Sequence, residues 1–338
     1  MNLVTALFRI PHVRAFYGLI GDTRSSLRLH FLYAAMHAGL LPALREPSTK
    51  QELARRLGAQ RPELLEALLE LGVSLKEISE GDGRYRLRGR RSKALATPEG
   101  DGAFAMAEEL LTYHADVYRQ FAARLRGAAP GDYLDEHAVL IARSSRVLDP
   151  MVGDFVRSLT RTGRPLRMLE VGCGSAIYLR YAAEANLQLT GVAVDVQEEV
   201  VKQARENVKA WGVDDRFEIH VADIRRPPPE LAGPFDLITL YNNVYYFEET
   251  ERPALFRSFR SWLAPGGAFA LVSMFHGRTF ASIDLDLALR CTAGCTGLPD
   301  LERTARQLRE AGFSDVKKAK LMLVEPLWGL VARPEAAP

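Results

Sequence analysis

The second half of the chain constrains the fold most, because short β-rich runs alternate there with amphipathic stretches. This alternation extends from about residue 166 to residue 333. Such a rhythm predicts βαβ units and a mostly parallel sheet. Strands are expected near residues 166–171, 189–194, 216–221, 235–241 and 267–273, and helices near 175–186, 198–210 and 250–263.

The bulk composition indicates a globular protein of about two domains. The chain has 338 residues, of which 47% are hydrophobic and 25% are charged. Its net charge of +2 gives no field that favours nucleic acid as a partner. No apolar run approaches the roughly 18–20 residues that span a bilayer, and the apolar start of the chain lacks signal-peptide features.

The three cysteines, Cys173, Cys291 and Cys295, do not form a disulfide framework in a chain of this size. Cys291 and Cys295 have no nearby residues that would complete a tetrahedral metal site. We therefore expect ordinary thiols in a reducing cytoplasm.

The first half of the chain is helical with one interruption. Two helices are expected around a turn at Gly58, and Thr49 and Glu52 have the spacing of a capping box. A β-hairpin should follow, with its turn at residues 81–83 (Gly-Asp-Gly). Helix-turn-helix followed by a hairpin predicts a winged helix.

A winged helix raises the question of DNA binding, and the hairpin is rich in arginine. The second helix would have to enter the major groove, yet it carries Glu63, Glu66 and Glu70 against a single Arg61. These carboxylates would face phosphates of the same sign. We expect no nucleic-acid partner.

The stretch "MLEVGCGSAIY" has the layout of a ligand loop. The first strand ends at Glu170 and turns through Gly172 and Gly174. A dinucleotide fingerprint needs a third glycine at position 177, where this chain has isoleucine, and no Gly-Lys-Ser/Thr follows for a Walker A loop. The loop therefore suits a ligand without phosphates.

Three acids end three successive strands, so they should meet at the carboxyl edge of one sheet. Glu170 suits a cation, and Asp195 can accept hydrogen bonds from both ribose hydroxyls. Asp223, with the apolar Ile224, suits an adenine amine and ring. The implied ligand has a cationic end, a ribose and an adenine.

From about 166 to 332 the pattern resembles class I S-adenosylmethionine (SAM)-dependent methyltransferases. "LEVGCGSA", "VAVDV", "VADI", "FDLITLYNNVYYF" and "WLAPGGAFAL" are similar to five family segments in order. The resemblance implies a Rossmann-like seven-stranded sheet, parallel with an antiparallel terminal strand, and last strands near 315–322 and 327–333. It implies SAM as cofactor, S-adenosyl-L-homocysteine (SAH) as product, and a binding set of Glu170, Gly172, Gly174, Ala176, Asp195, Val196, Asp223, Ile224 and Asn242. Ala176 replaces the third loop glycine, a change that we expect to be tolerated with φ below zero.

Residues 25–95 are similar to the winged-helix dimerisation domain of small-molecule O-methyltransferases. The resemblance implies a homodimer and a small-molecule acceptor. We expect a dimerisation domain over 1–100, a helical linker and substrate cap over 101–160, and a SAM-binding domain over 161–338. O-methylation is the default. C- or N-methylation, or an inactive regulator or scaffold, are the alternatives.

In the resembling O-methyltransferases a histidine after the fourth strand is the general base, and Tyr245 stands at that position here. Three explanations stay open: the acceptor needs alignment only, another histidine (His276, His114 or His137) serves as the base, or Tyr245 orients the acceptor. Our catalytic candidates are Tyr245 and His276.

Two further sets of charged residues were assigned from their positions. Asp284 and Asp286 would not share a helix face, so we expect solvated side chains and no metal. Arg143 is the candidate partner of the SAM carboxylate, with a surface ion pair as the equal alternative. The aromatic segment "LLTYHADVYRQF" suggests a largely apolar acceptor.

Overall fold

The computed structural model describes residues 11–228, 231 and 233–335, and the chain divides into two compact units. The helical unit comprises Met1–Asp116 and Val139–Val147, and the sheet unit comprises Val117–Ala138 and Leu148–Pro338. The segment 101–160, which we predicted as linker and cap, contributes to both units.

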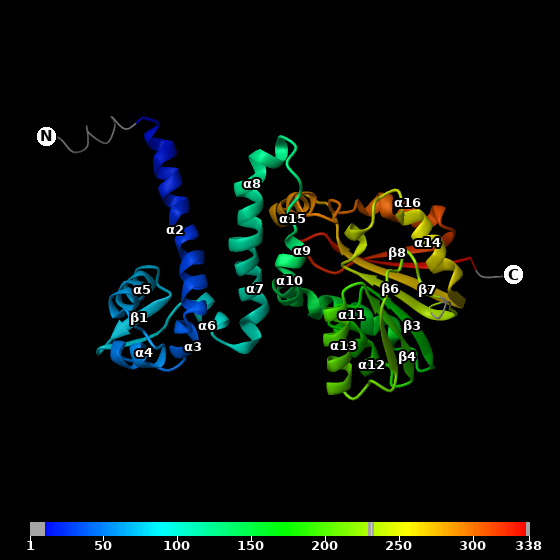
Figure 1. The fold of residues 1–338 in the computed structure, drawn as a ribbon, viewed down its shortest axis with the longest axis horizontal. Coiled ribbons are helices and arrows are strands. Elements are labelled where there is room, and N and C mark those ends of the chain that lie inside the picture. Colours follow the sequence, from blue (N-terminus) through cyan, green and yellow to red (C-terminus); the bar gives the residue numbers. More distant parts are fainter. Residues whose placement is uncertain (1–10, 229–230, 232, 336–338) are drawn as a thin grey trace. The chain divides into compact units, whose positions relative to one another are not determined.

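The helical unit contains the predicted sequence of helices and hairpin (Figure 1). Its α-helices are α2 (Val13–His37), α3 (Leu40–Ala43), α4 (Lys50–Arg56), α5 (Pro62–Ser74), α6 (Arg90–Leu95), α7 (Asp101–Glu109) and α10 (Ala138–Ser145), and α8 (Ala115–Leu125) begins in it. A π-helix, Leu110–His114, joins α7 to α8. The core of this unit includes Phe31, Leu53 and Leu69.

The local signals of this unit are confirmed. Thr49 and Glu52 form a capping box at the start of α4. Strands β1 (Ile78–Gly81) and β2 (Arg84–Leu87) pair antiparallel, and Asp82 and Gly83 between them have φ of 54° and 70°. Positive φ at both central residues is the geometry of a type I′ turn, whose twist suits a hairpin.

The sheet unit is built on a seven-stranded sheet of order β5-β4-β3-β6-β7-β9-β8. The strands are β3 (Leu166–Val171), β4 (Leu189–Asp195), β5 (Phe217–Val221), β6 (Phe235–Tyr241), β7 (Leu263–Met274), β8 (Phe313–Lys320) and β9 (Leu327–Pro334). β3 to β7 pair in parallel, and β9 runs antiparallel to both of its neighbours. The predicted sheet with one antiparallel terminal strand is therefore confirmed.

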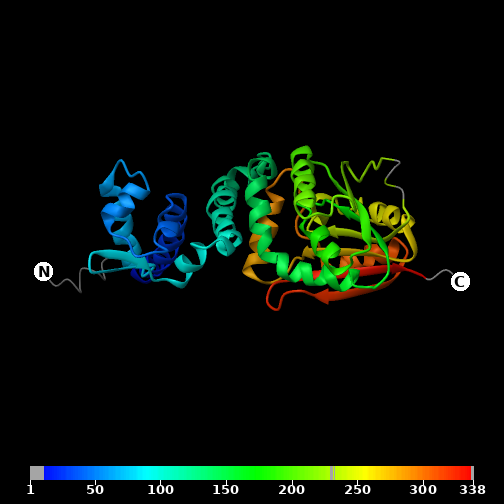
Figure 2. The ribbon, with the colours of Figure 1, turned by 90° about the horizontal axis from the view of Figure 1, so that it is seen from below.

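Helices cover both faces of this sheet (Figures 1 and 2). One face packs against α11 (Asp149–Thr160), α12 (Ile177–Ala185) and α13 (Glu198–Ala210), and the other against α14 (Arg252–Ser261) and α16 (Leu301–Glu310). Alternate residues of each strand enter the two cores, for example Met168 in one and Leu169 in the other. The unit also contains α9 (Tyr133–Glu136), α15 (Phe280–Arg290) and short 3₁₀ helices.

Strand β7 begins earlier than the sequence predicts. Leu263 pairs with Phe235 ahead of an irregular register, so the Pro-Gly-Gly segment belongs to the strand. Such pairing depends on a neighbour far away in the chain, which local pattern does not reveal.

Candidate functional site

The glycine loop after β3 leaves room for a ligand at one glycine and is closely backed at the other. Gly172 and Gly174 have φ of 67° and 53°, a region that favours glycine. A Cβ on Gly172 would lie 2.2 Å from the Asn243 amide nitrogen, whereas a Cβ on Gly174 would meet nothing within 4 Å. The backbone at Gly174 is therefore open to close approach.

Ala176 corrects one expectation. We expected φ below zero, but its φ is 63°, and the residue is the N-cap of α12. The chain must turn sharply between the loop and the helix, and its N–H donates to the Cys173 carbonyl (2.8 Å). A left-handed alanine costs about 1–2 kcal/mol. Backbone strain of this kind concentrates at functional sites.

Glu170 is a carboxyl group enclosed at the end of β3. It is 1% exposed, and its Oε2 has no hydrogen-bond partner among the described residues. Burial raises the pKa of Glu170 to about 8, and the nearby Asp195 adds to this effect. A cation next to this carboxyl would stabilise its ionised form against both burial and the charge of Asp195. Glu170 therefore fits the positively charged ligand that the sequence implied.

Asp195 lies beside the glycine loop, as the sequence predicts from the sheet edge. One of its oxygens accepts from the Gly174 N–H (3.1 Å) and the other from the Gln197 N–H (3.2 Å). The neighbouring Val196 is 57% exposed. The structure thus brings the candidate ribose acid to the open glycine.

Asp223 and Ile224 follow β5 at the same edge. The carboxylate of Asp223 accepts from the Arg225 N–H (3.0 Å), and Ile224 is 5% exposed. Arg225 also donates to the carbonyl of Tyr246 (2.6 Å), and its guanidinium lies over the Phe247 ring. Sequence reasoning missed Arg225, although its position directly after the predicted adenine corner was visible.

Asn242 and its neighbour Asn243, directly after β6, contact different parts of the site. Asn242 has φ of 56°, its N–H donates to Val272 (2.7 Å), and its side chain hydrogen-bonds Tyr178. Asn243, which sequence reasoning missed, donates from its amide to the carbonyls of Val171 (3.2 Å) and Gly172 (2.8 Å). Asn243 thus holds the start of the glycine loop in place.

The catalytic candidates Tyr245 and His276 both contact the α15–α16 loop, residues 291–300. The Thr296 N–H donates to the Tyr245 carbonyl (2.7 Å), and the His276 N–H donates to the Pro299 carbonyl (2.9 Å). Tyr245 is half-buried, and His276 is exposed. His114 is buried in the helical unit, and His137 stacks on Tyr133 in the sheet unit.

The two aspartates of α15 have structural partners, contrary to our expectation of solvated side chains. Asp286 accepts from the Leu298 N–H (2.7 Å) and from Arg290 (2.8 Å). Asp284 hydrogen-bonds Tyr118. Over the described ranges, no three His, Cys, Asp or Glu residues group closely enough to hold a metal ion.

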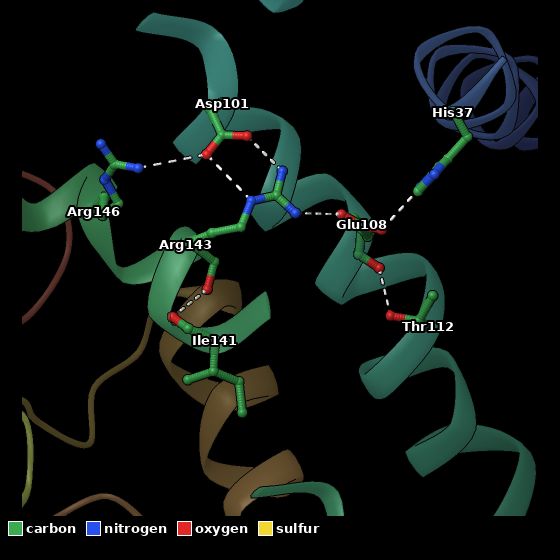
Figure 3. A network of polar contacts seen from close by, with 8 residues as sticks. His37, Asp101, Glu108, Thr112, Ile141, Arg143 and Arg146 are labelled. Atoms are coloured by element: carbon green, nitrogen blue, oxygen red, sulfur yellow. Dashed lines mark hydrogen bonds and ion pairs between the residues drawn. The ribbon is translucent and has the colours of Figure 1, made fainter. Parts of the chain in front are cut away.

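Arg143 forms the ion pairs that were its alternative assignment (Figure 3). Its guanidinium binds Asp101 (2.5 Å) and Glu108 (3.2 Å), and His37 contacts Glu108 (2.9 Å). All four residues belong to the helical unit. A role of Arg143 with SAM stays a prediction, and these carboxylates weigh against it.

A family model described as "Methyltransferase domain" matches residues 168–267. That match runs from within β3 to the start of β7 and includes Glu170, Asp195 and Asp223. The chain carries a methyltransferase domain over these residues.

The curated relatives match less than half of this chain. Phosphoethanolamine N-methyltransferase 3 of Arabidopsis thaliana is 30% identical over 151 residues, which cover 44% of this chain and 29% of that protein. Carboxy-S-adenosyl-L-methionine synthase of Erwinia tasmaniensis is 30% identical over 114 residues, 32% of this chain and 44% of that protein. The chain spans less than half the length of these relatives.

Solved structures share the fold over nearly the whole chain. Mitomycin 7-O-methyltransferase has a TM-score of 0.78 at 16% identity, and the match covers 96% of this chain and 99% of that one. Human N-acetylserotonin methyltransferase, solved with SAM, has a TM-score of 0.74 at 17% identity, covering 94% and 97%. The methyltransferase domain and the helical elements before it thus belong to one known architecture.

Proposed function

We propose that the protein transfers a methyl group from SAM to a small-molecule acceptor, with O-methylation as the first candidate. The observation that carries the proposal is that Glu170, Asp195 and Asp223 lie at the carboxyl ends of the adjacent strands β3, β4 and β5, with Asp195 bound to the N–H of the open Gly174. The match over 168–267 supports this reading. So does the whole-chain likeness in fold to proteins titled as O-methyltransferases.

In this proposal the chain holds SAM at the carboxyl ends of β3 to β6. The turn at Gly172 and Gly174 lets SAM approach the open backbone at Gly174, Asp195 binds the ribose, and Asp223 with Ile224 binds the adenine. Glu170 faces the cationic end, where its unpartnered oxygen fits a positive group. Bound SAM supplies a methyl group already activated by a positively charged sulfur, so the protein mainly aligns the acceptor and excludes water.

The acceptor side is proposed around Tyr245 and His276. A hydroxyl acceptor gains about 10²–10⁴-fold from a general base, and His276 is exposed. N-methylation is the second candidate. Tyr245 stands where a basic histidine is expected, and the sequence relatives include N-methyltransferases.

We propose that the helical unit is a winged-helix dimerisation domain over about 1–100, ahead of a cap over 101–160 and the SAM domain over 161–338. Helix α2 exposes Phe16, Leu19, Ile20 and Leu27 on one face. We propose that a second copy of this chain packs against these exposed apolar side chains. No helix among the described residues is long and apolar enough to cross a membrane. Three free cysteines support a cytoplasmic location.

Transfer of labelled methyl tests the activity. Protein is incubated with methyl-labelled SAM and the small-molecule fraction of an extract, and product is separated by chromatography. Label should enter a small molecule with wild-type protein and fall at least tenfold with Asp195→Ala. Wild-type protein without transfer, combined with DNA affinity at physiological salt, would favour the inactive regulator instead.

A further inference from the structure

Three successive carbonyls after β6 each accept a hydrogen bond from outside the 3₁₀ helix Val244–Tyr246. Tyr245 O accepts from Thr296 N (2.7 Å) and Thr296 Oγ1 (3.0 Å). Tyr246 O accepts from Arg225 Nη2 (2.6 Å), and Phe247 O accepts from Arg252 Nε (3.1 Å). These carbonyls lie at the end of a 3₁₀ helix, Val244–Tyr246, where in-helix donors run out.

Arg252 joins two of these contacts. Its Nη2 donates to Thr296 Oγ1 (2.9 Å) while its Nε holds Phe247. The residue is only 3% exposed, and burial lowers the pKa of its guanidinium. Burying a charged group is unfavourable unless hydrogen bonds compensate for the lost water. Here those bonds go to the segment that carries Tyr245.

Thr296 is itself fixed, because the α15–α16 loop is bound on several sides. Gly131 exchanges hydrogen bonds with Cys291 and Ala293 at one end (both 2.9 Å). Asp286 holds Leu298, and His276 holds Pro299, at the other end. Because the loop is fixed at both ends, Thr296 holds the backbone of Tyr245 in a defined position.

We infer that Thr296, oriented by the buried Arg252, is a positioning residue that sets where Tyr245 meets the methyl acceptor. The inference rests on the proposed function, in which the segment after β6 lies on the acceptor side. The Thr296 hydroxyl has two tasks, since it donates to the Tyr245 carbonyl and accepts from Arg252. Displacing a reacting partner by about 1 Å can lower a rate by 10²-fold.

Thr296→Val removes the hydroxyl but keeps the shape and the N–H bond, and Thr296→Ser keeps the hydroxyl. With the acceptor fraction found by methyl transfer, the valine variant should lose at least tenfold in kcat, with a smaller change in KM for SAM. The serine variant should stay within threefold of wild type. Both variants should bind SAH within twofold of wild type by calorimetry.

Thr160→Val is the matched control, because its buried hydroxyl donates to the Val156 carbonyl within α11 (3.0 Å), and its kcat should not change. If Thr296→Val does not fold, Arg252→Lys, which shortens the reach to Thr296, should show the same fall in kcat. Full activity of Thr296→Val, or equal losses with Thr296→Val and Thr296→Ser, would overturn this inference but not the proposed function. Wild-type protein that transfers no methyl would overturn the proposed function as well.

Discussion

At the scale of single residues, Glu170 has the most unusual chemistry in the sheet unit. Its carboxyl group is enclosed, and one of its oxygens has no hydrogen-bond partner among the described residues. Burial raises the pKa of the half-buried Tyr178 and of the buried Tyr241, and the nearby Glu170 adds to both shifts. The pKa of Glu170 is about 8, so the ligand-free protein holds a neutral acid at pH 7. An arriving cation favours the ionised form, which links ligand binding to proton release.

The raised pKa predicts a pH-dependent stability difference between Glu170→Gln and wild type. The pKa of Glu170 is about 8 in the fold and 4.5 ordinarily. The wild-type free energy of unfolding is therefore unreduced by this group below pH ~4.5, and it falls as the pH rises to ~8. Glutamine mimics the neutral acid and does not titrate. The melting temperature of the ligand-free variant, minus that of wild type, should rise from pH 5 to pH 8 and then level off. Glu206→Gln, at an exposed position on α13, is the control. A flat difference for Glu170→Gln would contradict the burial of this carboxyl.

Ala176 predicts a difference between two alanine-to-glycine changes. Ala176 and Ala183 are both buried, but only Ala176 has a left-handed backbone. Both glycine variants lose a buried methyl and gain unfolded-state freedom, whereas only Ala176→Gly relieves about 1–2 kcal/mol of strain. Urea unfolding should therefore leave Ala176→Gly more stable than Ala183→Gly by about that amount. Equal stabilities would mean that position 176 is unstrained.

The residues of the loop show how far sequence reasoning reaches. Gly172, Gly174 and Asp195 were predicted to meet, because strand ends and glycine turns have strong local signals. The sign of φ at Ala176 was wrong, since it depends on how the turn enters α12. Asn243 was missed because its contacts are with Val171 and Gly172, more than 70 residues earlier in the chain.

At the scale of elements, strands were predicted well where both faces are apolar. β3 and β6 begin and end at the expected residues, since each must be buried between helix layers. The α15–α16 loop had no local signal, because its partners Gly131, Tyr245 and His276 are distant in sequence. Loops held by long-range hydrogen bonds are the part of the site that pattern does not reveal.

Helix α2 carries the prediction on assembly. Leu19 is 67% exposed in the apolar stripe, so Leu19→Asp would place a charge in the proposed dimer interface. Sedimentation should show a dimer for wild type and a shift toward monomer for this variant. Leu187→Asp, the same change at an 82% exposed leucine between α12 and β4, should stay dimeric. A monomeric wild type, or a Leu19→Asp dimer of undiminished stability, would contradict a role for this face.

At the scale of the whole molecule, the seven-stranded sheet with its antiparallel terminal strand and the helix-hairpin unit followed from sequence and from resemblance. The acceptor did not, because its chemistry depends on how distant segments meet around Tyr245 and His276. The methyltransferase domain makes SAM binding the central claim, and the acids at the sheet edge are its physical basis.

Calorimetric titration with SAH tests that claim most directly. Wild-type protein should bind one SAH per chain, Asp195→Ala should bind at least tenfold more weakly, and NADH and ATP should give no binding heat under the same conditions. A wild-type protein that binds NADH or ATP at this site, and does not bind SAH, would contradict the account.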